Sequence, residues 1–189
     1  MKDMKTIILL AAAVLAFAWP ASAQQKRISP HETVSQVFDG VRNDRVTIYY
    51  GRPYSKDPKS DEIRKIWGTL VPYGKVWRTG ADEATLLVTQ KPLMIGGTEI
   101  PAGAYTLFTL PQEDGTAKLI INKQVGQWGI GAGSYDESQD LARVDLKKDA
   151  LDKPVDQFTI TLEKNPDGGG ILRMSWENTQ FSAAFTVKK

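Results

Sequence analysis

QFTITLE, from Gln157 to Glu163, alternates polar and apolar side chains without a break. Successive side chains of a β-strand point to opposite faces, so Phe158, Ile160 and Leu162 would all face a core. This stretch therefore predicts a half-buried strand. The same alternation returns near the C-terminus, where one face would carry Phe181, Ala183, Phe185 and Val187.

Several other segments combine β-branched and aromatic residues at the length of a strand. Connections rich in glycine or aspartate lie between some of them, at 95–98, 112–115 and 165–170, and such connections are typical of hairpins. The one helical turn that we expect is at 60–66. We predict an all-β fold, a single antiparallel β-sandwich that is jelly-roll or immunoglobulin-like in general architecture. The remaining strands are expected at Arg45–Tyr50, Ala84–Thr89, Tyr105–Leu110, Thr116–Asn122, Leu141–Leu146 and Ile171–Trp176.

The first 23 residues have the pattern of a secretory signal peptide. Lys2 and Lys5 precede an apolar run at 7–18, and the small residues at 21–23 match a cleavage site. We expect cleavage before Gln24 and one domain at 24–189. The apolar run is shorter than the roughly 20 residues that span a bilayer, and no later segment is apolar enough. These features predict an exported protein, periplasmic or extracellular, without an integral membrane segment after cleavage.

Composition excludes several classes of site. The chain has no cysteine, which removes disulfides and thiol catalysis, and one histidine, which removes metal sites built on clustered histidines. Charges of both signs are interspersed and the net charge is only +2, so nucleic acid is not expected as a partner. We predict no cofactor and no metal. The weak signal for calcium at Asp136, Glu137 and Asp140 lacks the spacing of a calcium loop.

One stretch, WRTGADEAT at Trp77–Thr85, concentrates an indole, a guanidinium and two carboxylates. In one interpretation, Arg78 binds an anionic ligand through two hydrogen bonds, and Asp82 and Glu83 bind hydroxyls or act as acid and base. In the other, which we favour, Arg78 forms an internal ion pair with Asp82 or Glu83. Neighbouring residues of a strand point to opposite faces, so the two carboxylates can share a pocket only where the chain is not extended.

Arg52 also has two interpretations. It ends a predicted strand, because Pro53 cannot continue the hydrogen-bonding ladder. Arg52 could join Arg78 in an anion site, but a salt bridge to Asp82 or Asp140 is the favoured interpretation.

The tryptophans beyond the signal segment could stack on sugars, but aromatic residues in strands usually pack in the core. Trp176 alternates with Leu172 and Met174 and is predicted to be buried. Trp128, which lies between glycines, is the best candidate for an exposed stacking surface, although core packing is favoured for it as well. His31 is predicted to be a surface residue.

Three long and unusual motifs occur in order along the chain, YGRP at 50–53, VPYGKVWRTGA at 71–81 and PAGAYTLF at 101–108. Asn122-Lys123, Gln127-Trp128-Gly129, Asp140 and Arg143 follow them. Through these residues the chain resembles a bacterial family catalogued as domain-of-unknown-function (DUF) family 2911. The resemblance implies an exported, mostly β protein whose biochemical role is unassigned.

The sequence departs from the family pattern at two places. The family usually has asparagine where this chain has Asp82. The segment Tyr54–Glu62, rich in lysine, aspartate, serine and proline, resembles an inserted solvated loop.

The function predicted from these features is an exported, non-catalytic binding or interaction module. Its polar pocket would suit an anionic or polyhydroxyl ligand, either a small molecule or an envelope component. One alternative is a hydrolase acting on envelope carbohydrate or peptide, with Asp82 and Glu83 as acid and base, and another is a structural envelope protein. No catalytic residue is assigned, and the candidate ligand-binding residues are Arg52, Trp77, Arg78, Asp82, Glu83, Trp128 and Arg143.

Overall fold

The computed structural model describes residues 27–38, 44–129, 131, 133–166 and 168–188. The predicted signal peptide at 1–23 lies outside these residues. Among the described residues, no helix has the length and apolar character needed to cross a membrane.

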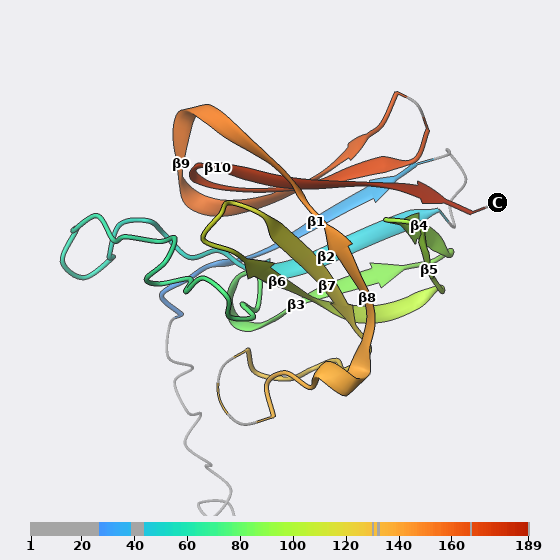
Figure 1. Ribbon diagram of the computed structural model, residues 1–189, viewed down its shortest axis with the longest axis horizontal. Helices are drawn as coiled ribbons and strands as arrows, with labels where there is room; N and C mark the ends of the chain where they lie inside the picture. Colours follow the sequence, from blue (N-terminus) through green and yellow to red (C-terminus); the bar gives the residue numbers. More distant parts are fainter. Residues whose placement is uncertain (1–26, 39–43, 130, 132, 167, 189) are drawn as a thin grey trace, which may run out of the picture.

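The regular secondary structure of the described chain is almost entirely β, arranged as two antiparallel sheets (Figure 1). The fold-class prediction of an antiparallel, sandwich-like architecture is therefore confirmed. The larger sheet has the order β1 (His31–Val37), β2 (Arg45–Gly51), β3 (Ala81–Thr89), β6 (Gly103–Pro111), β7 (Ala117–Asn122) and β8 (Asp140–Asp145). The smaller sheet has the order β5 (Thr98–Ile100), β4 (Leu93–Ile95), β10 (Gly170–Val187) and β9 (Lys147–Lys164).

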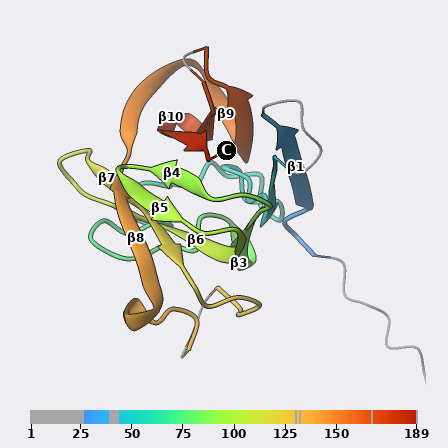
Figure 2. The same cartoon turned by 90° about the vertical axis from the view of Figure 1, so that its right-hand side faces the viewer.

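Three connections carry the chain from one sheet to the other, and one of them is the short link 101–102 between β5 and β6. β8 and β9 are separated only by Leu146, whose backbone N–H still donates to Ala117 of β7. β3 and β4 are joined by three residues, 90–92. The β9–β10 hairpin then lies over one face of the larger sheet, as Figures 1 and 2 show from two directions.

Two details differ from the sequence prediction. The expected helical turn at 60–66 is absent, and Ile63 instead forms an isolated antiparallel bridge with Lys56. β1 was not predicted, because HETVSQV lacks a clean alternation of polar and apolar residues. It forms by pairing with β2 along its whole length, from His31 opposite Gly51 to Val37 opposite Arg45.

Aromatic side chains fill one end of the space between the sheets. The indole of Trp176, 1% exposed, stacks on Trp77 with ring centroids 5.8 Å apart and an angle of 18°. Phe158 and Trp67 pack against the same two rings edge to face. The prediction that Trp176 is a core residue is confirmed, and the cluster places the stretch that follows Trp77 beside the core.

Tyr50 forms a hydrogen bond between the sheets. Its hydroxyl accepts from the backbone N–H of Ile160 on β9, at 2.9 Å. Burial raises the pKa of Tyr50 to about 12, so the phenol stays neutral in the folded protein.

We expect Tyr50→Phe to lower the free energy of unfolding by about 1–3 kcal/mol, because a buried N–H loses its acceptor. Above pH 10 the unfolded chain ionises Tyr50 before the folded one, so wild-type stability should fall between pH 10 and about 12. Urea titrations at pH 7 and pH 11 test both points, with Tyr49→Phe as the control because Tyr49 is 39% exposed. Equal losses in the two variants would contradict the prediction.

Candidate functional site

The start of β3 leaves its neighbour β2 and pairs with a loop. Leu86 lies opposite Tyr49 and Ala81 lies opposite Gly51, so four residues of β3 bulge out against one of β2. The bulged residues instead pair with the segment 127–129. The N–H of Ala84 donates to Gln127 (3.2 Å), and the N–H of Gly129 donates to the carbonyl of Asp82 (3.0 Å).

Left-handed backbone conformations shape this bulge. Thr79 has φ 56° and Asp82 has φ 65°, a region that non-glycine residues rarely adopt and that aspartate tolerates better than most. The conformation at Asp82 interrupts the alternation of a strand. One oxygen each of Asp82 and Glu83 and one ring nitrogen of His31 consequently lie within 4.8 Å of one another.

Glu83 is held by two basic groups from the N-terminal part of the described chain. Both of its oxygens accept from the Arg27 guanidinium, at 2.5 and 2.6 Å, and Nε2 of His31 lies 3.0 Å from Oε2. The Arg27 hydrogen bonds lower the pKa of Glu83 to about 2. The expectation of a surface histidine is wrong, because the His31 side chain is only 10% exposed and its ring stacks on Tyr49.

Arg78 has no such partner. Within the described residues its guanidinium forms no hydrogen bond or ion pair, and its buried Nε–H lacks an acceptor. The expected internal ion pair is therefore wrong. Burial lowers the pKa of Arg78, and the charge of Asp82 acts in the opposite direction.

Backbone contacts fix the position of Arg78. The N–H and carbonyl of Trp77 both bond to Thr109 on β6, at 2.8 and 2.9 Å. On the other side, a side chain at Gly129 would place its Cβ 2.0 Å from Cδ of Arg78. Only glycine lets the loop approach this closely, so Gly129 supports the orientation of the guanidinium.

A pocket of about 320 Å³ opens beside Arg78. Besides Arg78, its charged residues are Asp82 and Arg64, and the backbone carbonyl of Tyr54 already accepts from Arg64. Oδ2 of Asp82 is buried without a hydrogen-bond donor. The pocket thus combines two guanidinium groups and a carboxylate with the edges of aromatic and aliphatic side chains. The remaining lining residues are Ile28, Ser29, Pro53, Tyr54, Pro58, Leu70, Trp77, Gly80, Ala81 and Trp176.

Other predicted site residues lie around this pocket in different roles. Arg52 bonds to Glu32 (2.6 Å), Phe158 and Thr159, so its expected salt bridge to Asp82 or Asp140 is wrong. Trp77 is a core residue whose ring reaches the pocket wall. Trp128 is 53% exposed, which corrects the expectation of core packing, and it pairs with Glu83 on the bulge.

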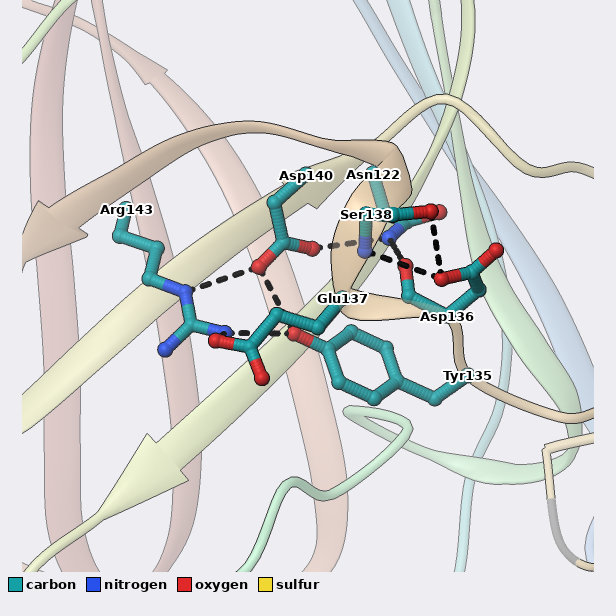
Figure 3. Close-up of polar contacts among 7 residues, drawn as sticks. All are labelled: Asn122, Tyr135, Asp136, Glu137, Ser138, Asp140 and Arg143. Carbon is teal, nitrogen blue, oxygen red and sulfur yellow. Dashed lines mark hydrogen bonds and ion pairs between the residues drawn. The ribbon is translucent and has the colours of Figure 1, made fainter.

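Arg143 belongs to a separate polar cluster around the 3-10 helix η1 (Glu137–Gln139) (Figure 3). Its guanidinium donates to Asp140, Tyr135 and Glu137, each at 2.8 Å. Asp140 also accepts from Tyr135 (2.7 Å) and from the buried Asn122 (2.8 Å). The carboxylates of Asp140 and Glu137, which gave the weak sequence signal for calcium, therefore have hydrogen-bond partners within the chain itself.

The Arg143 cluster holds the loop after β7 on the outer face of the larger sheet. The Tyr135 ring packs on Phe108 with centroids 4.9 Å apart, over a second small core with Ala84 and Ile120. Burial, and to a smaller extent the hydrogen bond to Asp140, raises the pKa of Tyr135 to about 12. Arg143 itself does not line the pocket, and the loop that it holds is the one that carries Trp128 and Gly129.

Three residues near the pocket were missed from the sequence, namely Arg27, His31 and Arg64. Arg27 and His31 are far from the β3 bulge in sequence, and β1–β2 pairing brings them to it. Arg64 follows the segment interpreted as an inserted loop. It lies among the many other charged residues of this solvated stretch, so its charge gave no signal of a pocket.

Comparison with known proteins finds one family. A family model described as "Protein of unknown function (DUF2911)" matches residues 29–185. No curated protein and no solved structure matches the chain. The matched span covers the β3 bulge and nearly all of the pocket lining and of both sheets, and the chain belongs to the DUF2911 family of proteins of unknown function.

Proposed function

We propose that the protein is an exported, non-catalytic binding module for a small ligand that carries an anionic group and hydroxyls. The observation that carries this proposal is the half-buried guanidinium of Arg78, which has no partner in the described part of the chain and lines a pocket of about 320 Å³. A buried cation without a counter-charge costs stability. An anionic ligand group would supply the missing acceptor.

The composition of the pocket supports a mixed ligand. Arg64 also has a buried Nε–H without an acceptor, and it would add a second cationic contact to the same anionic group. The free Oδ2 of Asp82 would accept from a ligand hydroxyl. Trp77 and Trp176 also line the pocket and give it an apolar part of the kind found in most ligand sites.

The carboxylates support binding better than hydrolysis. An acid–base pair needs one carboxyl group whose pKa is raised, so that it holds a proton near neutral pH. The pKa of Glu83 is instead lowered to about 2. At neutral pH its carboxylate therefore has no proton to donate, and it is also a poor proton acceptor. The hydrolase alternative would therefore need a base other than Glu83.

The test measures ligand binding and stability in the same variants. We expect a screen of uronic acids, sugar phosphates and hydroxy acids against metal-free protein to find a ligand that raises the melting temperature. Arg78→Met should weaken the binding of this ligand roughly 10- to 100-fold, because it removes a charge-assisted hydrogen bond to the anionic group. The same variant should be as stable as wild type or more stable, because it removes an unpaired buried charge.

Arg173→Met is the matched control, since Arg173 has its own partners in Glu163 and Gln180. It should leave ligand binding unchanged. A loss of stability in Arg78→Met without any ligand in the screen would favour the structural alternative and overturn the proposal. Turnover of a ligand would favour the hydrolase.

A further inference from the structure

A histidine and two carboxylates meet beside the pocket. Nε2 of His31 lies 3.0 Å from Oε2 of Glu83 and 3.9 Å from Oδ2 of Asp82. The three candidate ligand atoms lie within 4.8 Å of one another. In a tetrahedral zinc site with bonds of about 2.1 Å, ligand atoms are about 3.4 Å apart, so small side-chain movements would bring these three atoms to that spacing.

Two independent features point to a cation at this place. Oδ2 of Asp82 is buried and has no hydrogen-bond donor among the described residues, although Nε2 of His31 lies 3.9 Å away. In addition, a cationic group already lies between the other two ligands: Nη1 of Arg27 is 2.5 Å from Oε2 of Glu83 and 2.9 Å from Nε2 of His31. The guanidinium of Arg27 thus shows that this cluster attracts a positive charge.

We propose that His31, Asp82 and Glu83 form a binding site for a divalent transition-metal ion, which displaces the side chain of Arg27. One imidazole nitrogen with two carboxylate oxygens suits zinc and its neighbours better than calcium or magnesium, which prefer oxygen ligands alone. Three protein ligands leave at least one position open for water or for an oxygen of a bound molecule.

Arg27 is the most exposed of the groups in the cluster. Its side chain is 38% exposed, so the guanidinium can move into solvent while the metal ion replaces its charge beside Glu83. The three metal ligands are better fixed. His31 is only 10% exposed and stacks on Tyr49, while Asp82 and Glu83 are anchored through the backbone pairing of the bulge with 127–129.

The site would adjoin the proposed ligand pocket, because Asp82 belongs to both. The metal proposal does not rest on the ligand proposal. Metal binding is measured with zinc alone, and the ligand screen uses metal-free protein, so either can fail without the other. Arg78→Met should retain zinc binding, whereas it should lose the anionic ligand.

The experiment uses tag-free protein, since a histidine tag would itself bind zinc. Zinc chloride is titrated by calorimetry into wild type and into three variants. His31→Gln and Asp82→Asn should each weaken zinc binding at least tenfold, and asparagine at position 82 tolerates the left-handed backbone. Arg27→Gln should strengthen zinc binding, because it removes the competing cation. Calcium at the same concentrations should give no comparable heat.

A second measurement does not depend on the stability of any variant. The chain has a single histidine, so the imidazole nitrogens in a ¹⁵N-labelled sample report on His31 alone. Zinc should shift the Nε2 resonance of wild-type protein. Absence of zinc binding, an unshifted His31 resonance, or equal affinity in His31→Gln would each overturn the proposal.

Discussion

Trp176→Ala is expected to lower the free energy of unfolding by about 3–5 kcal/mol. Trp176 is 1% exposed and contacts Trp77, Trp67 and Phe158. The substitution removes the central ring of this cluster and leaves a cavity between the sheets. It also removes an indole N–H that donates to the carbonyl of Asp156 at 3.1 Å, although that carbonyl still accepts from the N–H of Ser55.

The measurement is a denaturant titration followed by far-ultraviolet circular dichroism, because removal of a tryptophan changes the fluorescence signal itself. Trp128→Ala is the matched control. Trp128 is 53% exposed, so its removal should change stability by no more than about 0.5 kcal/mol. Similar losses in both variants would contradict the assignment of Trp176 to the core and Trp128 to the surface.

Gly51→Ala is the second substitution for which we expect a large effect. A Cβ at position 51 would lie 2.2 Å from the carbonyl oxygen of Ala81 and 2.9 Å from its carbonyl carbon. Both atoms belong to the backbone of the neighbouring strand, so no side-chain rotation can relieve the contact. We expect β2 and β3 to separate locally, with a loss of about 3 kcal/mol in the free energy of unfolding.

The same substitution should damage the pocket, since Ala81 lines it and leads directly into Asp82. Zinc and ligand binding should both weaken in the fraction that remains folded. Gly97→Ala is the control, because a Cβ there meets nothing within 4 Å and costs only the left-handed backbone at φ 79°, about 1 kcal/mol. If Gly51→Ala were no more destabilising than this control, the close approach of β2 and β3 would not be the reason for glycine at position 51.

The left-handed backbone at Asp82 gives a physical reason for the residue types found there. Asparagine and aspartate are the non-glycine residues that tolerate this conformation best. The resemblance to the family implied asparagine at this position, and this chain has aspartate, with φ 65°. The left-handed backbone favours a short polar side chain, which either residue supplies. The negative charge of Asp82 is therefore a property of this chain that the backbone conformation does not require.

Much of the fold could be predicted because its strands carry their own signal. Alternation at Gln157–Glu163 reflects a sheet with one buried face, and the residue period of two is visible without knowing the partner strand. The glycine-containing turn at 95–98 likewise shows in the sequence as a hairpin. The polar β1 carries little such signal, since its conformation depends on pairing with β2.

The candidate site could be predicted only as a region. The charged residues of Trp77–Thr85 indicated the location of the site. Composition excluded thiol chemistry and metal sites built on clustered histidines. The expected partner of Arg78 was wrong, because carboxylates four and five residues away are near in sequence but are turned toward His31 and Arg27 by the bulge.

By itself, the sequence determined an antiparallel β fold, its main strands and the family to which the chain belongs. The fold and its strands follow from the local periodicity of the sequence, and the family follows from motifs that occur in a given order along it. Only the tertiary structure decided that Arg78 has no partner among the residues described and that His31 joins Asp82 and Glu83. Those contacts depend on strand register and on a left-handed residue at the start of β3, and neither leaves a periodic pattern in the sequence.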